Sequence, residues 1–480
     1  MRYKFKHKPY DHQRIALVKS WNKPDFALFM DMGTGKSKVL IDNCGILYDR
    51  GEIEAALIIA PKGVYRNWER SEIPKHLPDH IERKVVAWSP EKTKKKQTEL
   101  DTLFLQDEEL KILLMNVEAF STKRGVEFAE KFLMSWTTLL AVDESTTIKN
   151  HKAKRTKSLI KLGNLATYKR VLTGSPVTRS PMDLFSQCFF LNEEILQQNS
   201  FWAYQNRYAK MIRSNSGTHS FNQIVGFQNL DEISRLIEPY SYRVKKEECL
   251  DLPDKVYQRR TVELTNEQKV IYNQLVTMAL AILAEEGGTI STTTVLTQIL
   301  RLQQVVSGHC KMDDGRIIDV PSNKMPELLQ IVGEINGKAI IWANFTDDIE
   351  KIHKKLSEIY GLESCATFYG GTKAENRQDI VEAFQDPLNP LRFFIGQPRT
   401  GGYGLTLTEA KTVIYYSNGY DLEIRLQSED RAHRIGQTNK VTYIDIIAEN
   451  TVDDKILKAL RAKIDIASIV LAEGYTTWLI

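Results

Sequence analysis

The sequence has few cysteines and no long apolar run, and each absence removes a class of protein. Its 480 residues include five cysteines, an odd number, which are scattered and form no CxxC pair. This argues against a disulfide framework and against a zinc site, and it favours a reducing compartment. No apolar stretch is long enough for a bilayer, and the basic segment 1–8 is not followed by the apolar run of a signal peptide. We therefore expect a soluble, intracellular, cytoplasmic protein with no membrane partner.

A large excess of charge of either sign is also missing. The 65 basic and 61 acidic side chains give a net charge of +4. This is too mild to establish a nucleic-acid partner, so any basic surface must be local. The length is sufficient for two or three domains with a large core. His309-Cys310 is the only adjacent His/Cys pair, and we interpret it as part of a loop.

A glycine loop between a strand and a helix is the first chemical motif. Segment 26–30 is a short apolar run that predicts a buried strand, and a helix is expected from 39 onward. This is the context of a phosphate-binding loop, because glycines let backbone N–H groups face phosphates and the helix dipole adds to them. Lys36 would reach the terminal phosphates of ATP and Ser37 would bind Mg2+. The ATP-binding residues predicted here are Met32, Gly33, Thr34, Gly35, Lys36 and Ser37.

Two adjacent carboxylates follow a second apolar strand, predicted at 138–142. Asp143 is expected to hold Mg2+ through water, and Glu144 to act as the base on the attacking water. A pair of solvated loop acids is the alternative, and the apolar strand directly before them favours the functional interpretation. The basic run 149–157 comes next, either as a solvated helix face or as a surface for nucleic-acid phosphates. Its position beside the acids favours the phosphate surface.

The segment 427–437 contains Arg431 and Arg434, which would share one face if the segment is helical. The guanidinium fork matches phosphate oxygens and stays charged. Two such groups have a clear use if charge develops on a nucleotide phosphate opposite them. An arginine pair on a solvated helix is the alternative. Repeated strand–helix units, before 183 and again after 338, predict parallel sheets covered by helices on both faces.

These motifs together resemble superfamily 2 helicase-type ATPases, and within them the Swi/Snf-like DNA translocases. The matching segments are Gln13, 33–37, 61–62 with Trp68, 143–150, 172–176, 401–407 and 427–437. The last of these, with its core Arg-Ala-His-Arg-Ile-Gly-Gln, is the most specific. Thr146 stands where the family usually has a histidine that couples ATP to the segment 172–176, so the coupling route is open. Ser175 and Thr406 are further departures from the pattern.

The resemblance implies an α/β fold of two RecA-like parallel-sheet lobes with helical insertions and an ATP site in the cleft between them. We expect a first lobe at 1–240 with an insertion at about 183–240, a linker at 241–257, and a second lobe at 258–480 with an insertion at about 258–320. The aromatic and basic segment 201–208 would either stack on nucleic acid or pack in the core.

The resemblance also extends the expected sites. The catalytic residues would be Lys36, Asp143, Glu144, Arg431 and Arg434. Gln13, Gly404 and Gln427 would join the ATP site, with Mg2+ on Ser37 and Asp143. The expected nucleic-acid contacts are Pro61, Lys62, Lys149, Asn150, Arg399, Thr400 and Gly401.

The expected function is that of an ATPase motor on double-stranded DNA, monomeric as a motor unit, which moves along DNA or remodels it, with protein cargo as an additional option and repair or recombination as a setting. Duplex and branched DNA are both open as substrates. One alternative is a helicase that separates strands or migrates branches. Another, from a different class, is a nucleic-acid clamp that uses ATP as a switch without turnover. The compact motor suggests a prokaryotic or viral source.

Overall fold

The structure, a computed structural model, describes residues 3–61, 65–91, 93–216, 219–249, 252–285, 292–312, 315–373, 376–401, 405–434 and 436–470. The chain forms two compact units, one mainly from 3–210 and 226–249 and the other mainly from 252–464. Among the described helices, none has the length and apolar character that a membrane crossing requires.

The first unit is built on a seven-stranded sheet in the order β3-β4-β2-β5-β6-β1-β9, and all of its neighbouring pairs are parallel. The apolar sequence of β2, AALIIA, is buried along its whole length, as in a parallel sheet that is covered on both faces. The strands are β1 (Asp25–Met30), β2 (Ala55–Ala60), β3 (Arg83–Ala87), β4 (Leu110–Asn116), β5 (Thr138–Asp143), β6 (Tyr168–Leu172) and β9 (Ser241–Val244).

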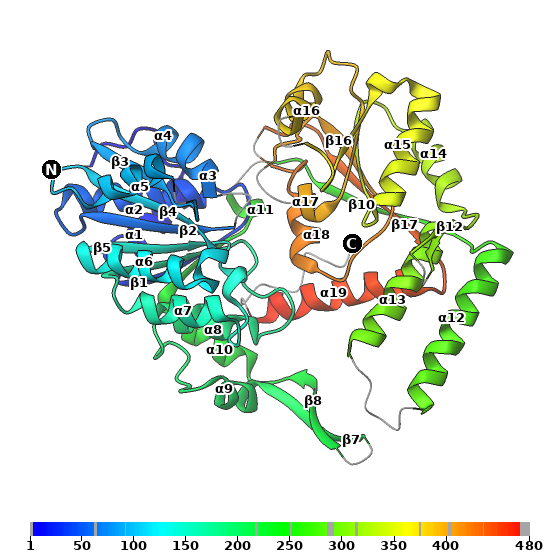
Figure 1. The fold of residues 1–480 in the computed structure, drawn as a ribbon, viewed down its shortest axis with the longest axis horizontal. Helices are drawn as coiled ribbons and strands as arrows, with labels where there is room; N and C mark the ends of the chain where they lie inside the picture. The colour runs from blue at the N-terminus through cyan, green and yellow to red at the C-terminus, as the bar shows by residue number, and fades with distance from the viewer. Residues whose placement is uncertain are drawn as a thin grey trace. The chain divides into compact units, whose positions relative to one another are not determined.

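Two hydrophobic cores cover the two faces of this sheet, because successive strand residues point to opposite sides. Leu57 packs into one core with residues of α6, α7 and α8, and Ile58 packs into the other with residues of α1, α2 and α4 (Figure 1). The helices of this unit are α1 (Asp11–Ser20), α2 (Lys36–Asp49), α3 (Tyr65–Asn67), α4 (Ile73–His76), α5 (Lys94–Asp101), α6 (Lys123–Ser135), α7 (Lys154–Gly163), α8 (Asp183–Leu191), α9 (Phe201–Tyr208), α10 (Leu230–Ile237) and α11 (Lys246–Cys249).

The second unit has a six-stranded sheet in the order β10-β17-β16-β13-β15-β14, again with parallel pairs throughout. Its strands are β10 (Lys255–Val262), β13 (Lys338–Trp342), β14 (Cys365–Phe368), β15 (Phe393–Gly396), β16 (Ala410–Tyr415) and β17 (Val441–Ala448). Its helices are α12 (Asn266–Glu285), α13 (Thr292–Ser307), α14 (Lys324–Glu334), α15 (Thr346–Tyr360), α16 (Asn376–Gln385), α17 (Pro398–Gly401), α18 (Leu422–Glu429) and α19 (Val452–Val470).

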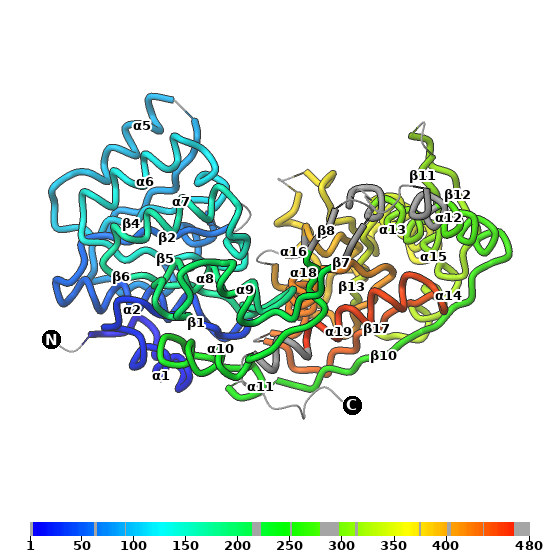
Figure 2. Tube along the Cα trace, turned by 90° about the horizontal axis from the view of Figure 1, so that it is seen from below, coloured from blue at the N-terminus to red at the C-terminus, as the bar shows by residue number. Residues whose placement is uncertain are grey.

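The two parallel-sheet lobes predicted from the sequence are confirmed, and the connecting segments contain strands that the sequence did not reveal. The predicted linker 241–257 begins in β9 of the first sheet and ends in β10 of the second. The first insertion contains the paired strands β7 (Ala209–Ser216) and β8 (His219–Phe227) besides its helices. In the second insertion, α12 and α13 lie side by side, as Figure 2 shows. The domain boundaries themselves stay predictions.

The pair His309-Cys310 corrects one expectation. We interpreted it as part of a loop, but it begins strand β11 (His309–Lys311), which pairs antiparallel with β12 (Ile317–Asp319). The side chain of His309 is only 2% exposed. A strand of three residues is too short to leave a periodic signal in the sequence.

Candidate active site

The glycine loop lies at the carboxyl end of β1 and leads directly into α2. Gly33 and Gly35 have φ angles of 77° and 90°, in the left-handed region that favours glycine. A Cβ atom at Gly35 would lie 2.2 Å from Gln13 Nε2, so the Gln13 side chain would have to shift to admit it. The hydroxyl of Thr34 donates to Asp31 O at 2.7 Å and closes the loop. The loop thus presents backbone at a helix N-terminus, which suits an anion.

The ammonium of Lys36 is held at the base of this loop. Nζ donates to Met30 O at 2.8 Å and to Asp31 O at 3.2 Å, and the residue is 9% exposed. Carbonyl oxygens orient an ammonium without neutralising it. Phosphate oxygens, which carry charge, would be stronger partners for the same group.

Asp143 ends β5, on the sheet edge where the phosphate loop also lies, because carboxyl ends of parallel strands share one edge. Its Oδ2 accepts from Trp68 Nε1 at 3.1 Å and its Oδ1 from the backbone N–H of Glu144 at 3.0 Å. Burial raises the pKa of the Asp143 carboxyl, and the Lys36 ammonium and the Trp68 indole oppose this shift. Glu144 has a φ of 48°, a strained value outside glycine.

The donor set on this edge fits Mg2+. The Asp143 carboxylate and the Ser37 hydroxyl, from the first turn of α2, are oxygen donors of the kind that Mg2+ prefers. A buried carboxylate with a raised pKa lacks full compensation of its charge, and a divalent cation would supply it.

Asp31 connects the phosphate loop to two later segments of the first unit. Arg243 Nη1 lies 2.9 Å from Asp31 Oδ1 and also donates to Gly174 O at 3.1 Å. The backbone N–H of Lys246 donates to Asp31 Oδ2 at 3.0 Å. Burial by itself would raise the pKa of Asp31, but Arg243 and Lys246 outweigh burial and bring it below its ordinary value. Strand β9 is therefore part of the phosphate-loop support.

Gln187 on α8 joins the segment after Glu144 to the segment after β6. Its Oε1 accepts from Ser145 Oγ at 2.7 Å, and its Nε2 donates to Pro176 O at 2.8 Å. Both Ser145 and Gln187 are fully buried. The neighbouring Thr146 is buried as well, at 2% exposed. A hydrogen-bonded path therefore runs from Ser145, the neighbour of Glu144 in the chain, to Pro176 through one amide side chain.

A second connection between these segments runs through Thr178. Lys149 Nζ donates to Thr178 Oγ1 at 2.7 Å. The carboxylate of Asp183, at the start of α8, accepts from the backbone N–H groups of Thr178 and Arg179 at 3.0 and 2.7 Å. The loop after β6 is thus fixed from two sides.

In the second unit, the arginine segment is not a continuous helix. Helix α18 ends at Glu429, and Arg431 and Arg434 lie in the turns that follow. The two guanidinium groups still converge, because Arg431 Nη1 and Arg434 Nη1 donate to the same carbonyl, Leu405 O, at 3.2 and 3.1 Å. Arg431 Nε also donates to Gln427 O at 2.8 Å.

The turns after α18 are fixed by Gly436 and by the contacts of Gln437 with the segment before β16. Gly436 has a φ of 102°, and the side-chain amide of Gln437 donates to Thr408 O at 2.8 Å and to Ala410 O and Ala432 O at 3.1 Å each. One glutamine therefore folds the chain back onto the segment before β16. The arginine spacing is the same as in a helix, but these long-range bonds set the geometry.

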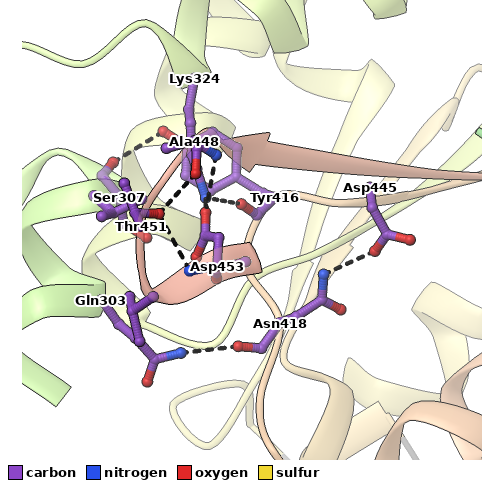
Figure 3. Close-up of polar contacts among 12 residues, drawn as sticks. Gln303, Ser307, Lys324, Tyr416, Asn418, Asp445, Ala448, Thr451 and Asp453 are labelled. Atoms are coloured by element: carbon purple, nitrogen blue, oxygen red, sulfur yellow. Dashed lines mark hydrogen bonds and ion pairs between the residues drawn. The ribbon is translucent and has the colours of Figure 1, made fainter. Parts of the chain in front are cut away.

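A buried charge network holds α18 itself. Arg425 Nη2 lies 3.1 Å from Asp445 Oδ2, and Arg425 Nε lies 2.8 Å from Glu429 Oε1. Asn418 Nδ2 donates to Asp445 Oδ1 at 2.7 Å, and Gln303 Nε2 of α13 donates to Asn418 O at 2.9 Å (Figure 3). The network connects the helical insertion to the helix that precedes the arginines.

Comparisons with known proteins agree with these motifs. Residues 16–311 match the SNF2-related domain, and residues 323–436 match the helicase conserved C-terminal domain. The chain belongs to the SNF2-related family. The first match extends over most of the first unit and into the second, and the second match lies within the second unit.

Members of this family with curated descriptions are distant in sequence. YwqA of Bacillus subtilis, whose name describes an ATP-dependent helicase/translocase, is 26% identical over 446 residues, which cover 90% of this chain and 45% of the relative. The SWI/SNF chromatin-remodeling complex subunit snf22 of Schizosaccharomyces pombe is 25% identical over 462 residues, which cover 92% of this chain and 26% of the relative. The chain thus spans less than half of the length of these relatives.

A solved structure of a family member also aligns with the chain. The Sulfolobus solfataricus SWI2/SNF2 ATPase core in complex with dsDNA is 24% identical and covers 98% of this chain and 95% of its own, with a TM-score of 0.44.

The predicted ATP residues of the first unit lie together. Gln13 contacts the glycine loop, since Nε2 donates to Thr34 O at 3.0 Å, and Oε1 accepts from the backbone N–H of Tyr10 at 3.1 Å. His12 Nε2 lies 2.8 Å from the same Thr34 oxygen. The Gln13 amide, which was expected to join the ATP site, thus contacts the glycine loop. Gln427 lies with the arginines in the second unit. Gly404 falls outside the described residues.

The predicted nucleic-acid residues vary in exposure. Asn150 and Arg399 are exposed, Lys149 and Thr400 are half-buried, and Pro61 is buried. Lys62 lies outside the described residues, and Gly401 ends α17. Segment 201–208 divides between the two interpretations, because Tyr204 and Tyr208 are fully buried whereas Trp202 is 63% exposed.

Sequence reasoning missed the supporting residues Gln187, Arg425 and Asp445. A weak signal existed for two of them. Gln187 lies in the mainly apolar run DLFSQCFFL and Asp445 in VTYIDIIA. A polar residue within a buried run needs a partner, and this requirement marks it for attention before the partner is known.

Proposed function

We propose that this chain is an ATP-driven motor that moves along double-stranded DNA. Membership of the SNF2-related family supports the class, and the names of the relatives describe helicases, a translocase and chromatin-remodelling subunits. The observation that carries the proposal is the joint presence of a phosphate loop with Lys36 at its base and the buried carboxylate of Asp143 on the same sheet edge.

In this mechanism, backbone N–H groups of 33–37 and the Lys36 ammonium hold the phosphates of ATP. Ser37 and Asp143 would hold Mg2+, and the ion would supply positive charge to the phosphates. Glu144 takes a proton from the attacking water. Arg431 and Arg434 of the second unit contact the terminal phosphate during turnover and stabilise the charge that develops there.

Movement along DNA would follow from this cycle. If the arginines engage ATP only in one state of the cycle, hydrolysis changes the relation of the two units. Contacts to one phosphate backbone would then advance without reading sequence. The exposed side chains of Asn150 and Arg399 are suited to such contacts.

The deciding experiment measures phosphate release by the purified chain with ATP and Mg2+, alone and with duplex, single-stranded and four-way-junction DNA of equal length. We expect duplex DNA to stimulate turnover most. Preference for junctions with strand displacement would instead establish the branch-migrating or strand-separating helicase. DNA binding that depends on ATP but without phosphate release would establish the switched clamp.

The control is Lys36→Ala, which removes the ammonium at the loop base. We expect turnover to fall to background while duplex affinity without nucleotide stays within about twofold of the parent chain, since backbone phosphate contacts supply that affinity. Unchanged turnover in this variant would contradict the assignment of the loop as the ATP site.

A further inference from the structure

His309, Asp347 and Asp348 come together in the second unit, apart from every motif described above. His309 begins β11, and the two aspartates lie in the first turn of α15. His309 Nδ1 is 3.2 Å from Asp348 Oδ1 and 3.6 Å from Asp347 Oδ2. One candidate ligand atom from each residue lies within 4.8 Å of the others. His309 and Asp348 are each 2% exposed.

Helix capping and ion pairing are the two ordinary reasons for such a cluster. Carboxylates in the first turn of a helix are favoured by its dipole, so the aspartates alone do not define a site. A charged histidine paired with Asp348 would also account for the short distance, but an N–H that donates to a carboxylate is directed at its oxygen. Among the described residues, His309 Nδ1 has no hydrogen-bond partner, and neither does Asp348 Oδ2.

This geometry differs from that of an ordinary ion pair. Nδ1 lies 3.2 Å from Asp348 Oδ1 without meeting the geometry of a hydrogen bond, and one ligand atom of each of the three residues lies within 4.8 Å of the others. Around a tetrahedral ion with bonds of about 2.0–2.2 Å, neighbouring ligand atoms lie roughly 3.3–3.6 Å apart. The separations of 3.2 and 3.6 Å from Nδ1 are close to this spacing.

We propose that His309, Asp347 and Asp348 form a binding site for a divalent transition-metal ion, with Zn2+ as the best fit. One imidazole nitrogen and two carboxylate oxygens suit Zn2+, whereas Mg2+ prefers oxygen donors alone. The cysteine pattern that argues against a zinc site in the sequence does not bear on a site of this composition. Water fills the remaining coordination position.

The Lys351 ammonium would compete with the proposed metal ion for the Asp347 carboxylate. Its Nζ lies 2.7 Å from Asp347 Oδ2, one helical turn away, and 2.5 Å from Asp319 Oδ1 of β12. It also donates to Gly308 O at 3.3 Å. The ammonium compensates part of the negative charge and shares an oxygen with the proposed ion. Removal of this ammonium should therefore strengthen metal binding.

The ion would have a structural effect. It would connect β11, which follows α13 within the second insertion, to the N-terminus of α15, which packs in the core of the second unit. Phe345 covers one edge of the His309 ring, with ring centroids 5.1 Å apart. His309 and Asp348 are buried, so we assign the site a structural and not a catalytic role.

The test uses the full chain, stripped of metal with a chelator and titrated with Co2+ and Zn2+ in the absence of nucleotide. We expect one equivalent to bind, with visible Co2+ bands of a low coordination number and no thiolate charge-transfer band. Zn2+ should raise the midpoint of thermal unfolding, because it binds the folded chain. Asp348→Asn and His309→Gln should each weaken Co2+ binding by more than about tenfold.

Further variants test whether the ion binds at these three residues. Lys351→Met should strengthen Co2+ binding, whereas Lys355→Met, whose parent lysine pairs with Glu358 at 3.1 Å on the same helix, should leave it unchanged. Cys310→Ser should also leave it unchanged. Absence of stoichiometric binding, or binding that survives both Asp348→Asn and His309→Gln, would overturn the proposal. In the first case the cluster is a charged His309–Asp348 ion pair and holds no metal.

Discussion

Asp143 in the first unit and Glu429 in the second are both buried carboxylates beside a predicted catalytic segment, and their surroundings differ. Asp143 accepts from the Trp68 indole and from a backbone N–H, and burial raises its pKa. Glu429 accepts from Tyr257 OH at 2.8 Å and lies 2.8 Å from Arg425 Nε and 3.3 Å from Lys255 Nζ. Burial acts on Glu429 too, but Lys255 and Arg425 outweigh it and lower its pKa.

The difference shows two uses of a buried negative charge. The charge of Asp143 is left partly uncompensated, which suits a residue that receives a cation with its ligand. The charge of Glu429 is compensated by Lys255 and Arg425 within the second unit, and these contacts hold the end of α18, two residues before Arg431. The two buried carboxylates thus differ in how far neighbouring cations and donors compensate their charge.

The largest expected effect concerns the positioned arginines. Arg434→Ala should lower kcat for ATP by about 1,000-fold or more, because a guanidinium on the developing phosphate charge contributes that much in phosphoryl transfer. Duplex binding should stay nearly intact. The measurement is steady-state phosphate release at saturating duplex, with Arg434→Lys as the variant that keeps charge but not the fork. Full ATPase activity of Arg434→Ala would contradict the proposed role of Arg434 in stabilising charge on the terminal phosphate.

Arg425→Met tests whether the second unit depends on its charge network. The change leaves Asp445 and Glu429 without their guanidinium, and loss of one partner of a buried pair costs about 3–5 kcal/mol. Urea unfolding of the variant and the parent chain measures this loss in the free energy of unfolding. Asp445→Asn in the same chain should restore part of the loss, because the two residues are in contact. A cost below about 1 kcal/mol for Arg425→Met would show that the network does not hold α18.

Glu429→Gln tests, through the pH dependence of stability, whether the pKa of Glu429 is lowered whereas that of Asp143 is raised. In the folded chain the pKa of Glu429 lies below its ordinary value of 4.5. The stabilising contribution of the ionised Glu429 is therefore complete at pH values above its ordinary pKa. It is lost as the pH falls through the lowered pKa of the folded chain. The free energy of unfolding of the parent chain should exceed that of the variant by about 1.5–3 kcal/mol near pH 7. This difference should disappear as the pH is lowered into the acid range. The groups that face this carboxylate are Lys255, Tyr257 and Arg425. A gap that widens in acid would contradict the assignment.

The smallest expected effect on stability is at Gln187. Gln187→Leu keeps the volume but removes the partner of the Ser145 hydroxyl and the Pro176 carbonyl, which should cost about 1–2 kcal/mol. We also expect kcat for ATP to fall while KM for ATP is unchanged, since the bridge positions the acidic pair without touching the nucleotide loop. Combination with Ser145→Ala should be non-additive in kcat. Additive losses would mean that Gln187 is merely a packing residue.

The sequence alone predicted the groups whose chemistry is local. The phosphate loop, the acidic pair after β5 and the parallel-sheet class each depend on neighbours in the chain, on glycines beside a lysine or on apolar runs that end in carboxylates. Sequence reasoning could not locate Arg243 on Asp31 or Gln187 between Ser145 and Pro176. Arg243 lies 212 residues from Asp31 and Gln187 lies 42 residues from Ser145, and no spacing rule joins either pair.

The arginine segment 427–437 shows what the sequence determines and what only the tertiary structure decides. Its residue types and its likeness to SNF2-related proteins were evident in the sequence. A shared helical face was expected only if the segment is helical, and the structure has turns there instead. Helix α18 ends at Glu429, and Gln437 and Leu405 decide where the guanidinium groups lie. Residue identity sets which charges and donors exist. Their geometry and pKa depend on burial and on partners from distant strands, which only the folded chain brings within hydrogen-bonding distance.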